Sequence, residues 1–192
     1  MRILVININR SGSTNLCKGL SKYFNLEYYP SPFREYILNQ PKDLEFYKTN
    51  PNILHVRVLN HTYESLSELI DIYDNVILLS RNNLKEAIES WAYVSYYRDR
   101  QDVSFKTHVT KYVWEKTENY QEIESHLKRD NEIIKKLASE FNLPITYYED
   151  LYYNNPSETI KSLNLGIDYD NFKTYLDTTK RQRILSKNKN II

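Results

Sequence analysis

The sequence predicts an α/β fold in three layers (α/β/α), with a central, mainly parallel sheet and a phosphate-binding loop after the first strand. Three observations predict it. Short runs of β-branched and other apolar residues alternate with longer segments whose apolar residues recur every three or four positions. These runs are apolar at nearly every position, which is typical of parallel strands covered on both faces. The first run also leads directly into a polar turn that contains a glycine and opens a helical pattern.

The strands are expected where the apolar runs lie, at residues 2–8, 53–59, 75–80 and 144–150. The first three are nearly continuous in Ile, Leu and Val, so they are expected to lie parallel in one sheet. Because strands and helices alternate, the connections between them are expected to be right-handed βαβ units.

Helices are expected at residues 14–24, 63–73, 84–97, about 112–141 and 155–163. Pro156 suits the first turn of the last helix, and Gly166 marks the stop after it. Residues 27–52 contain four prolines and are expected to form a long loop with a short helix, a type of connection that can shape a substrate site. No internal repeat, linker or low-complexity tract interrupts the sequence, so residues 1–192 are expected to form a single domain.

Composition limits the classes of function. The chain is 41% hydrophobic and 27% charged, as in soluble globular proteins, and no apolar run approaches the roughly 18 residues that cross a bilayer. A formal net charge of +1 gives no global attraction to nucleic acid or to a membrane surface. The single cysteine, Cys17, excludes an internal disulfide and fits a cytoplasmic location. The histidines and Cys17 show no metal-ligand spacing, so no metal is expected.

The turn after the first strand, Asn9-Arg10-Ser11-Gly12-Ser13-Thr14, has the chemistry of an anion site. Backbone N–H groups at a helix N-terminus attract anions, hydroxyl groups add donors, and Arg10 offers a planar cation. Gly12 is one of only three glycines in the chain, which indicates a backbone position with special demands. The Walker A pattern is absent, which argues against an NTP hydrolase. An ordinary capped turn is the alternative interpretation.

The segment RSGSTNLCKGL resembles the phosphosulfate loop of sulfotransferases that use 3′-phosphoadenosine-5′-phosphosulfate (PAPS), nearest to the bacterial trehalose-sulfotransferase type. The match runs from Arg10 to Leu16 and departs from the usual pattern at Asn9, where proline or glutamine is common. The resemblance implies that the loop wraps the 5′-phosphosulfate, with Arg10 near the transferring group. The loop residues that it assigns to this cofactor are Arg10, Ser11, Gly12, Ser13, Thr14 and Asn15.

Three later segments extend the resemblance. In VILLSRNNLKEAIESW, Arg81 and Ser90 stand nine positions apart, and the resemblance implies that they bind the 3′-phosphate. Arg81 follows a predicted central strand, where ligands bind in open α/β sheets. The segment ITYYEDLYYNNP resembles a structural stretch of the family, so Glu149 and Asp150 are expected to act as scaffold. The basic segment 180–189 resembles the family's phosphate-covering tail, with Arg181 and Arg183 as candidates.

For sulfuryl transfer, the protein must align the donor with the acceptor and neutralise the negative charge on the oxygens of the leaving group. A base must also take the proton of the acceptor. The resemblance places a carboxylate base shortly after the first helix, near Glu27, with Glu35 as a more distant choice. His61, at the carboxyl end of the second predicted strand, is the rival base.

The expected activity is therefore direct in-line transfer from PAPS, without a metal, to an acceptor hydroxyl of a small molecule or glycan, with a carbohydrate favoured. Nucleic acid and membrane insertion are not expected. Two alternatives stay open at this point. The first is a nucleotide kinase or NTPase with a degenerate loop, and the second is a protein that binds a phosphorylated or sulfated ligand without catalysis.

Overall fold

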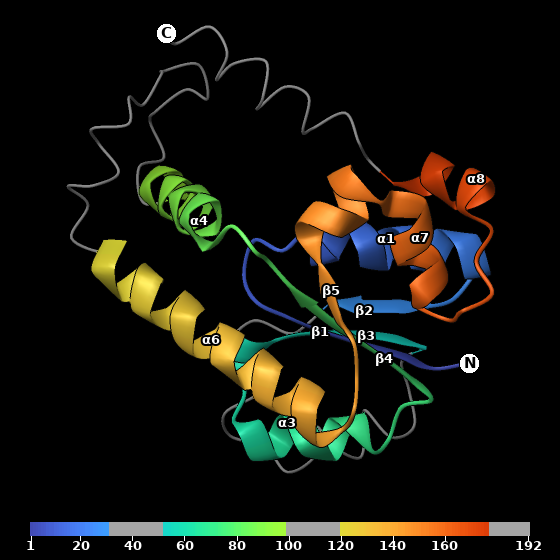
Figure 1. Ribbon diagram of the computed structural model, residues 1–192, viewed down its shortest axis with the longest axis horizontal. Helices are drawn as coiled ribbons and strands as arrows, with labels where there is room; N and C mark the ends of the chain where they lie inside the picture. Colours follow the sequence, from blue (N-terminus) through green and yellow to red (C-terminus); the bar gives the residue numbers. More distant parts are fainter. Residues whose placement is uncertain (31–51, 99–119, 177–192) are drawn as a thin grey trace, which may run out of the picture.

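The sheet has five strands, all parallel, in the order β2-β3-β1-β4-β5. The computed structural model describes residues 1–30, 52–98 and 120–176 (Figure 1). The strands are β1 (Ile3–Asn7), β2 (Tyr28–Pro30), β3 (Ile53–Arg57), β4 (Asn75–Ser80) and β5 (Ile145–Tyr147). β1 lies at the centre, with Ile3 in register with Ile53 of β3 and with Asn75 of β4. The predicted α/β class and parallel sheet are therefore confirmed.

Helices cover both faces of the sheet, as three layers require (Figure 1). The helical elements are α1 (Ser13–Phe24), η1 (Val58–Asn60), α3 (Tyr63–Ile70), α4 (Leu84–Arg98), α6 (Tyr120–Glu140), η2 (Asp150–Asn154), α7 (Pro156–Ser162), α8 (Tyr169–Phe172) and η3 (Lys173–Tyr175). None of the helices within the described ranges has the length and hydrophobicity that crossing a bilayer would need.

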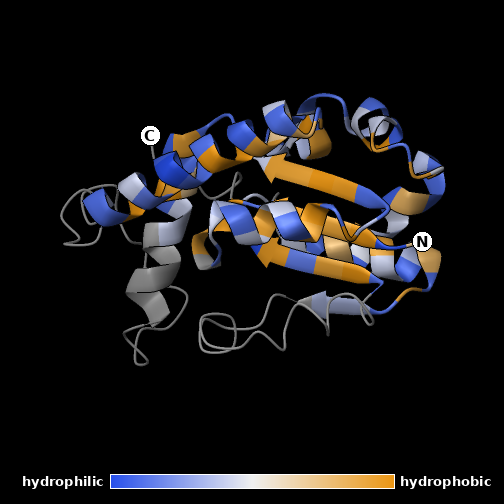
Figure 2. Ribbon diagram, turned by 90° about the horizontal axis from the view of Figure 1, so that it is seen from below, coloured by the Kyte–Doolittle hydropathy of each residue, from blue (hydrophilic) through white to orange (hydrophobic). Residues whose placement is uncertain are grey.

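Alternation along the strands sends side chains into two separate cores. On one face, Leu4 and Ile6 of β1 pack with α3, α4 and α6, and on the other, Ile3 and Val5 pack with α1 and α7. Figure 2 shows the consequence: the strands are hydrophobic along most of their length, whereas the covering helices carry hydrophilic residues on their outer faces. Burying each of these large side chains contributes about 1.5–3 kcal/mol.

The structure differs from the sequence-based elements at several element ends; for example, β3 ends at Arg57 instead of residue 59, because the chain turns there into η1. Two further differences lie at the edges of the sheet. Residues 28–30, inside the expected loop, add β2 as an edge strand beside β3. The last predicted strand ends at Tyr147 instead of residue 150, because the chain turns there into η2, a π-helical turn in which the amide of Asn155 donates to the carbonyl of Asp150. The part of the predicted long helix before residue 120 lies outside the described residues.

The chain reverses its direction of travel across the sheet at β1. From β1 it passes through α1 to the β2 edge, whereas from β4 it passes through α4 and α6 to the β5 edge. The carboxyl ends of β1 and β4 therefore meet at a topological switch point, the place where ligands bind in open α/β sheets.

Candidate functional site

The loop between β1 and α1 is a tight backbone turn with two left-handed residues. Arg10 has φ 65° and Gly12 has φ 77°, so the backbone reverses within a few residues of the strand end. The hydroxyl of Ser11 donates to the carbonyl of Ile8 at 2.8 Å, and this side chain is fully buried. The hydroxyl of Ser11, a predicted donor to a phosphate, therefore donates within the turn in this structure, and its predicted contact with the cofactor is left to its backbone amide.

Gly12 is held between two tyrosines. A Cβ atom at this position would lie 2.6 Å from Cε2 of Tyr152 and 2.8 Å from Cδ2 of Tyr148. The hydroxyl of Tyr152 also donates to the carbonyl of Gly12 at 3.0 Å. The left-handed φ and the close rings both require glycine, which confirms the special backbone position that the sequence indicated.

The first turn of α1 lies at the carboxyl edge of the sheet and contains no charged side chain. No side chain caps the helix, and no acidic residue lies in its first turn. The first N–H groups of a helix have no intrahelical partner and carry partial positive charge. Ser13 and Thr14 place hydroxyl groups in the same turn, and Arg10 lies exposed beside it. This arrangement can bind an anion such as a phosphate or a phosphosulfate.

Ser13 belongs to a buried chain of hydrogen bonds that sequence reasoning missed. Its Oγ lies 2.8 Å from Nε2 of His55, and Nδ1 of His55 lies 3.0 Å from the hydroxyl of Tyr28. Burial, with a smaller electrostatic effect of Arg57, lowers the pKa of His55 to about 4, so the ring is neutral at pH 7. The one sequence feature that could have pointed to this chain of hydrogen bonds is a single histidine inside a mostly apolar strand. No metal-ligand or catalytic spacing marks this histidine.

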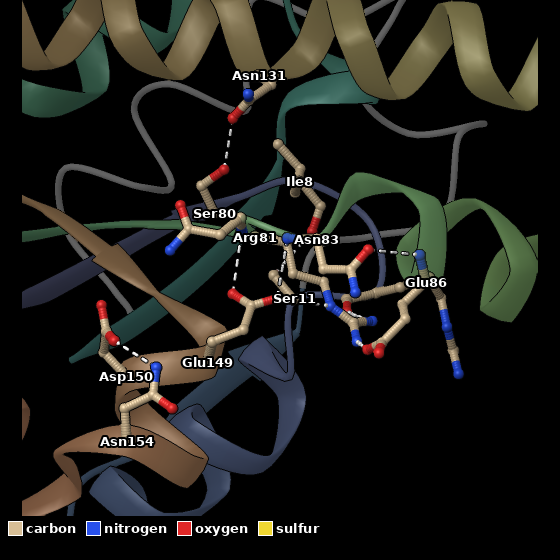
Figure 3. A network of polar contacts seen from close by, with 12 residues as sticks. Ile8, Ser11, Ser80, Arg81, Asn83, Glu86, Asn131, Glu149, Asp150 and Asn154 are labelled. Atoms are coloured by element: carbon tan, nitrogen blue, oxygen red, sulfur yellow. Dashed lines mark hydrogen bonds and ion pairs between the residues drawn. The ribbon is translucent and has the colours of Figure 1, made fainter. Parts of the chain in front are cut away.

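Arg81 follows β4 and lies under the loop, with only 7% of its side chain exposed. Its Nη1 donates to the carbonyl of Arg10 at 3.2 Å, and its guanidinium stacks 4.3 Å above the ring of Tyr148. Two carboxylates pair with it: Glu86 at 2.7 Å from Nη2 and Glu149 at 3.4 Å from Nε (Figure 3). The predicted ligand of a 3′-phosphate is therefore already paired with acidic side chains of the protein.

Ser90 of α4 contacts the loop directly. Nε of Arg10 donates to Oγ of Ser90 at 2.9 Å, although the two residues are 80 positions apart in the sequence. Arg10, Arg81 and Ser90, which the sequence singled out in two separate motifs, therefore meet at one edge of the sheet.

Glu149 acts as scaffold, as expected. Its two carboxylate oxygens accept from the backbone amides of Asn82 at 2.9 Å and Asn83 at 3.1 Å, which fixes the turn that opens α4 (Figure 3). Asp150 accepts from the side-chain amide of Asn154 at 2.9 Å within η2. Glu149 thus orders the backbone beside Arg81, whereas the Asp150 carboxylate bonds within η2.

The structure separates Glu27 from the loop. Tyr28 is in register with Ile53, which is in register with Ile3, so Glu27 stands at the amino edge of the sheet. The loop begins at the carboxyl edge, about six strand residues or roughly 20 Å away. The prediction that Glu27 is the catalytic base is therefore wrong for this arrangement, since a base must reach the proton it accepts.

His61 lies just after η1, at the carboxyl edge. Burial lowers the pKa of its ring to about 4, and its Nε2 has no hydrogen-bond partner among the described residues. The lowered pKa makes the ring a weaker base than a free imidazole, and its Nε2 is buried in this structure, so the role of His61 as the base stays a prediction. Glu35, Arg181 and Arg183 lie outside the described residues.

Comparisons with known proteins return no relative. No family model, no curated protein and no solved structure matches the chain. Among the described residues, no group of three or more His, Cys, Asp or Glu side chains is arranged to hold a metal ion.

Proposed function

We propose that this chain is a PAPS-dependent sulfotransferase that binds its nucleotide across the loop after β1 and the turn after β4. One observation carries the proposal. Arg10 of the loop donates to Ser90 of α4 at 2.9 Å, and Arg81 donates to the carbonyl of Arg10. Two sequence segments that resemble the family's phosphosulfate and 3′-phosphate motifs therefore lie side by side, which supports the binding of one nucleotide by both.

The residues present fit such a nucleotide in their donor chemistry. The uncapped first turn of α1, the hydroxyls of Ser13 and Thr14, and Arg10 would hold the 5′-phosphosulfate. Arg81 and Ser90 would hold the 3′-phosphate, with Glu86 moving away from Arg81, since the Glu86 side chain is 54% exposed. PAPS supplies an activated sulfuryl group whose transfer leaves adenosine 3′,5′-bisphosphate.

The remaining catalytic task falls to this chain's own side chains. Arg10 and the N-terminal amides of α1 neutralise charge on the leaving oxygens without a metal ion. His61 is the proposed base for the acceptor's proton, a role that requires its Nε2, which is buried here, to become accessible to the acceptor. The acceptor is a hydroxyl, with that of a carbohydrate favoured.

Calorimetric titration tests the nucleotide assignment. The wild type is expected to bind adenosine 3′,5′-bisphosphate at least about tenfold more tightly than 5′-AMP, because only the bisphosphate carries a group for Arg81 and Ser90. Arg10→Ala is expected to weaken bisphosphate binding roughly 10- to 100-fold, the size of a charge-assisted hydrogen bond. Lys18→Ala removes one exposed cation from the same helix outside the loop and is the matched control. Equal affinity for the two nucleotides would contradict the assignment.

A second candidate is a non-catalytic binder of the same ligand, and the distance of Glu27 from the loop favours it. A transfer assay with labelled PAPS and carbohydrate acceptors separates the two. We expect His61→Gln to lower transfer by about 100-fold, the contribution of one general base, and Glu27→Gln to leave it unchanged. Tight bisphosphate binding without any transfer would favour the binder.

A further inference from the structure

A line of hydrogen bonds crosses the sheet face beneath α1. It runs from the hydroxyl of Tyr28 on the edge strand β2, through both nitrogens of His55 on β3, to Oγ of Ser13 in the first turn of α1. His55 is 2% exposed and Ser13 is 5% exposed, so bulk water does not compete for the contact between them, whereas Tyr28 at the edge is half-buried. The Tyr28 and His55 rings are also nearly parallel, with centroids 6.1 Å apart.

The line can be polarised in two directions. In one, Ser13 donates to Nε2 and Nδ1–H donates to Tyr28, which is the arrangement of a histidine that activates a serine nucleophile. In the other, Tyr28 donates to Nδ1 and Nε2–H donates to Ser13. A neutral histidine carries one proton, so the two directions exclude each other.

The chemistry of the end groups favours the second direction. A phenol is a stronger donor and a weaker acceptor than an aliphatic hydroxyl, because its lone pair is delocalised into the ring. Burial also raises the pKa of Tyr28, so its phenol keeps the proton that it donates. With His55 neutral, Nε2–H then donates to the serine oxygen, which is the better acceptor of the two hydroxyls.

We propose that Tyr28 and His55 hold Ser13 as a fixed hydrogen-bond donor to the anion at the loop, so that His55 is a positioning residue acting through Ser13. With one lone pair occupied by Nε2–H, the Ser13 hydroxyl directs its own proton toward the uncapped turn of α1. This inference rests on the proposed function only in so far as the loop binds an anion. It also makes Ser13 a poor nucleophile, because a protonated Nε2 cannot accept the serine proton.

The direction of the line is measured in the protein without ligand. Long-range ¹H–¹⁵N correlation spectra of uniformly labelled protein report which ring nitrogen of each histidine carries the proton, and His55→Gln identifies the His55 signals by their loss. We expect the Nε2–H form in the wild type. In Tyr28→Phe, which removes only the hydroxyl, we expect part of the population to change to the Nδ1–H form. A wild-type ring in the Nδ1–H form overturns the proposal.

The effect on the anion is measured by a double-mutant cycle with inorganic pyrophosphate as the probe. Ser13→Ala is expected to weaken pyrophosphate binding about tenfold and His55→Leu about fivefold. Because His55 acts through Ser13, His55→Leu is expected to cost nothing further in the Ser13→Ala protein. His55→Gln, whose amide can still donate to Ser13, is expected to bind within about twofold of the wild type.

Losses that add in the double variant would mean a general structural role for His55 and overturn the proposal, as would a wild type that does not bind pyrophosphate. A wild type that binds pyrophosphate but does not distinguish adenosine 3′,5′-bisphosphate from 5′-AMP would contradict the nucleotide assignment alone. The two ideas therefore fail through different measurements.

Discussion

Two helices begin at the same edge of the sheet, and their first turns are built in opposite ways. In α4, Oδ1 of Asn83 accepts from the amide of Glu86 at 3.2 Å, and Glu149 accepts from the two amides just before the helix. In α1, no side chain caps the first turn and no acidic residue lies in it. The protein therefore satisfies the start of α4 with its own oxygens, whereas the start of α1 has no such side-chain cap, as the proposed anion site requires.

The cations beside these two helix starts differ in the same sense. Arg10 is exposed and reaches toward Ser90, whereas Arg81 is buried between Glu86 and Glu149. A second anion can therefore reach Arg81 only by exchange with a carboxylate. Glu86 is the one that can leave, because it is 54% exposed, while Glu149 is 17% exposed and also holds the backbone of the turn. Under the proposed function, the α1 side would therefore bind an anion directly, whereas the α4 side would bind one only after Glu86 moves away from Arg81.

The largest effect is expected from a substitution that disrupts the loop before α1. Gly12→Ala is expected to lower the free energy of unfolding by about 3 kcal/mol or more, because the new Cβ would combine a positive φ with contacts at 2.6 and 2.8 Å to two tyrosine rings. Chemical denaturation measures it. Gly166→Ala is the matched control, since Gly166 has φ +69° and no heavy atom within 4 Å. It is expected to cost about 1 kcal/mol, and an equal cost at both sites would contradict the packing argument.

The next largest effect is expected from low pH, which lowers the free energy of unfolding. Among the contacts compared here, it acts on the α1 side by protonating His55. Its pKa is about 4 in the folded protein and about 6.5 unfolded, so the unfolded chain binds a proton that the native state refuses. Stability is fully present above pH 6.5 and falls by about 3 kcal/mol as the pH drops to 4. Urea unfolding at several pH values is expected to show a shallower loss for His55→Gln than for the wild type. Parallel curves for the two proteins would show that His55 keeps its ordinary pKa.

The smallest effect is expected from a substitution that removes one of the two carboxylates paired with Arg81, beside the start of α4. Glu86→Gln removes the carboxylate that pairs with Arg81 at 2.7 Å, so adenosine 3′,5′-bisphosphate is expected to bind about three- to tenfold more tightly. Glu68→Gln, on the exposed side of α3, changes the net charge equally and is expected to have no effect. Calorimetric titration of the wild type and the two variants with adenosine 3′,5′-bisphosphate measures this change in affinity. Unchanged or weaker binding by Glu86→Gln would mean that Glu86 does not occupy a ligand position.

The sequence predicted the fold well because its signals were local. The β-branched runs at β1, β3 and β4 and the glycine turn after β1 were each visible within a few residues. The strand β2 was missed because a three-residue segment ending at Pro30 carries too little pattern to separate it from a loop. This segment is a strand because it pairs with β3, and a pairing with a distant strand cannot be predicted from the local sequence.

The candidate site was predicted in part, and the errors share one cause. Arg10, Arg81 and Ser90 were found because their motifs are local, and the structure brings them together. Glu27 was misplaced because its position relative to the loop depends on which edge of the sheet its strand enters from. Ser13 and His55 are 42 positions apart and Arg81 and Glu149 are 68 positions apart, and no spacing rule links such residues.

The hydroxyl of Tyr152 meets the carbonyl of Gly12 across 140 positions of sequence. During synthesis the central strand and its turn therefore leave the ribosome long before the aromatic rings that shape that turn have been made. A nascent chain that ends before residue 148 would contain Arg10 and Arg81 but would lack Glu149 and the two tyrosines that pack against Gly12. The loop after β1 thus gains its full set of contacts only after residue 152 has been synthesised.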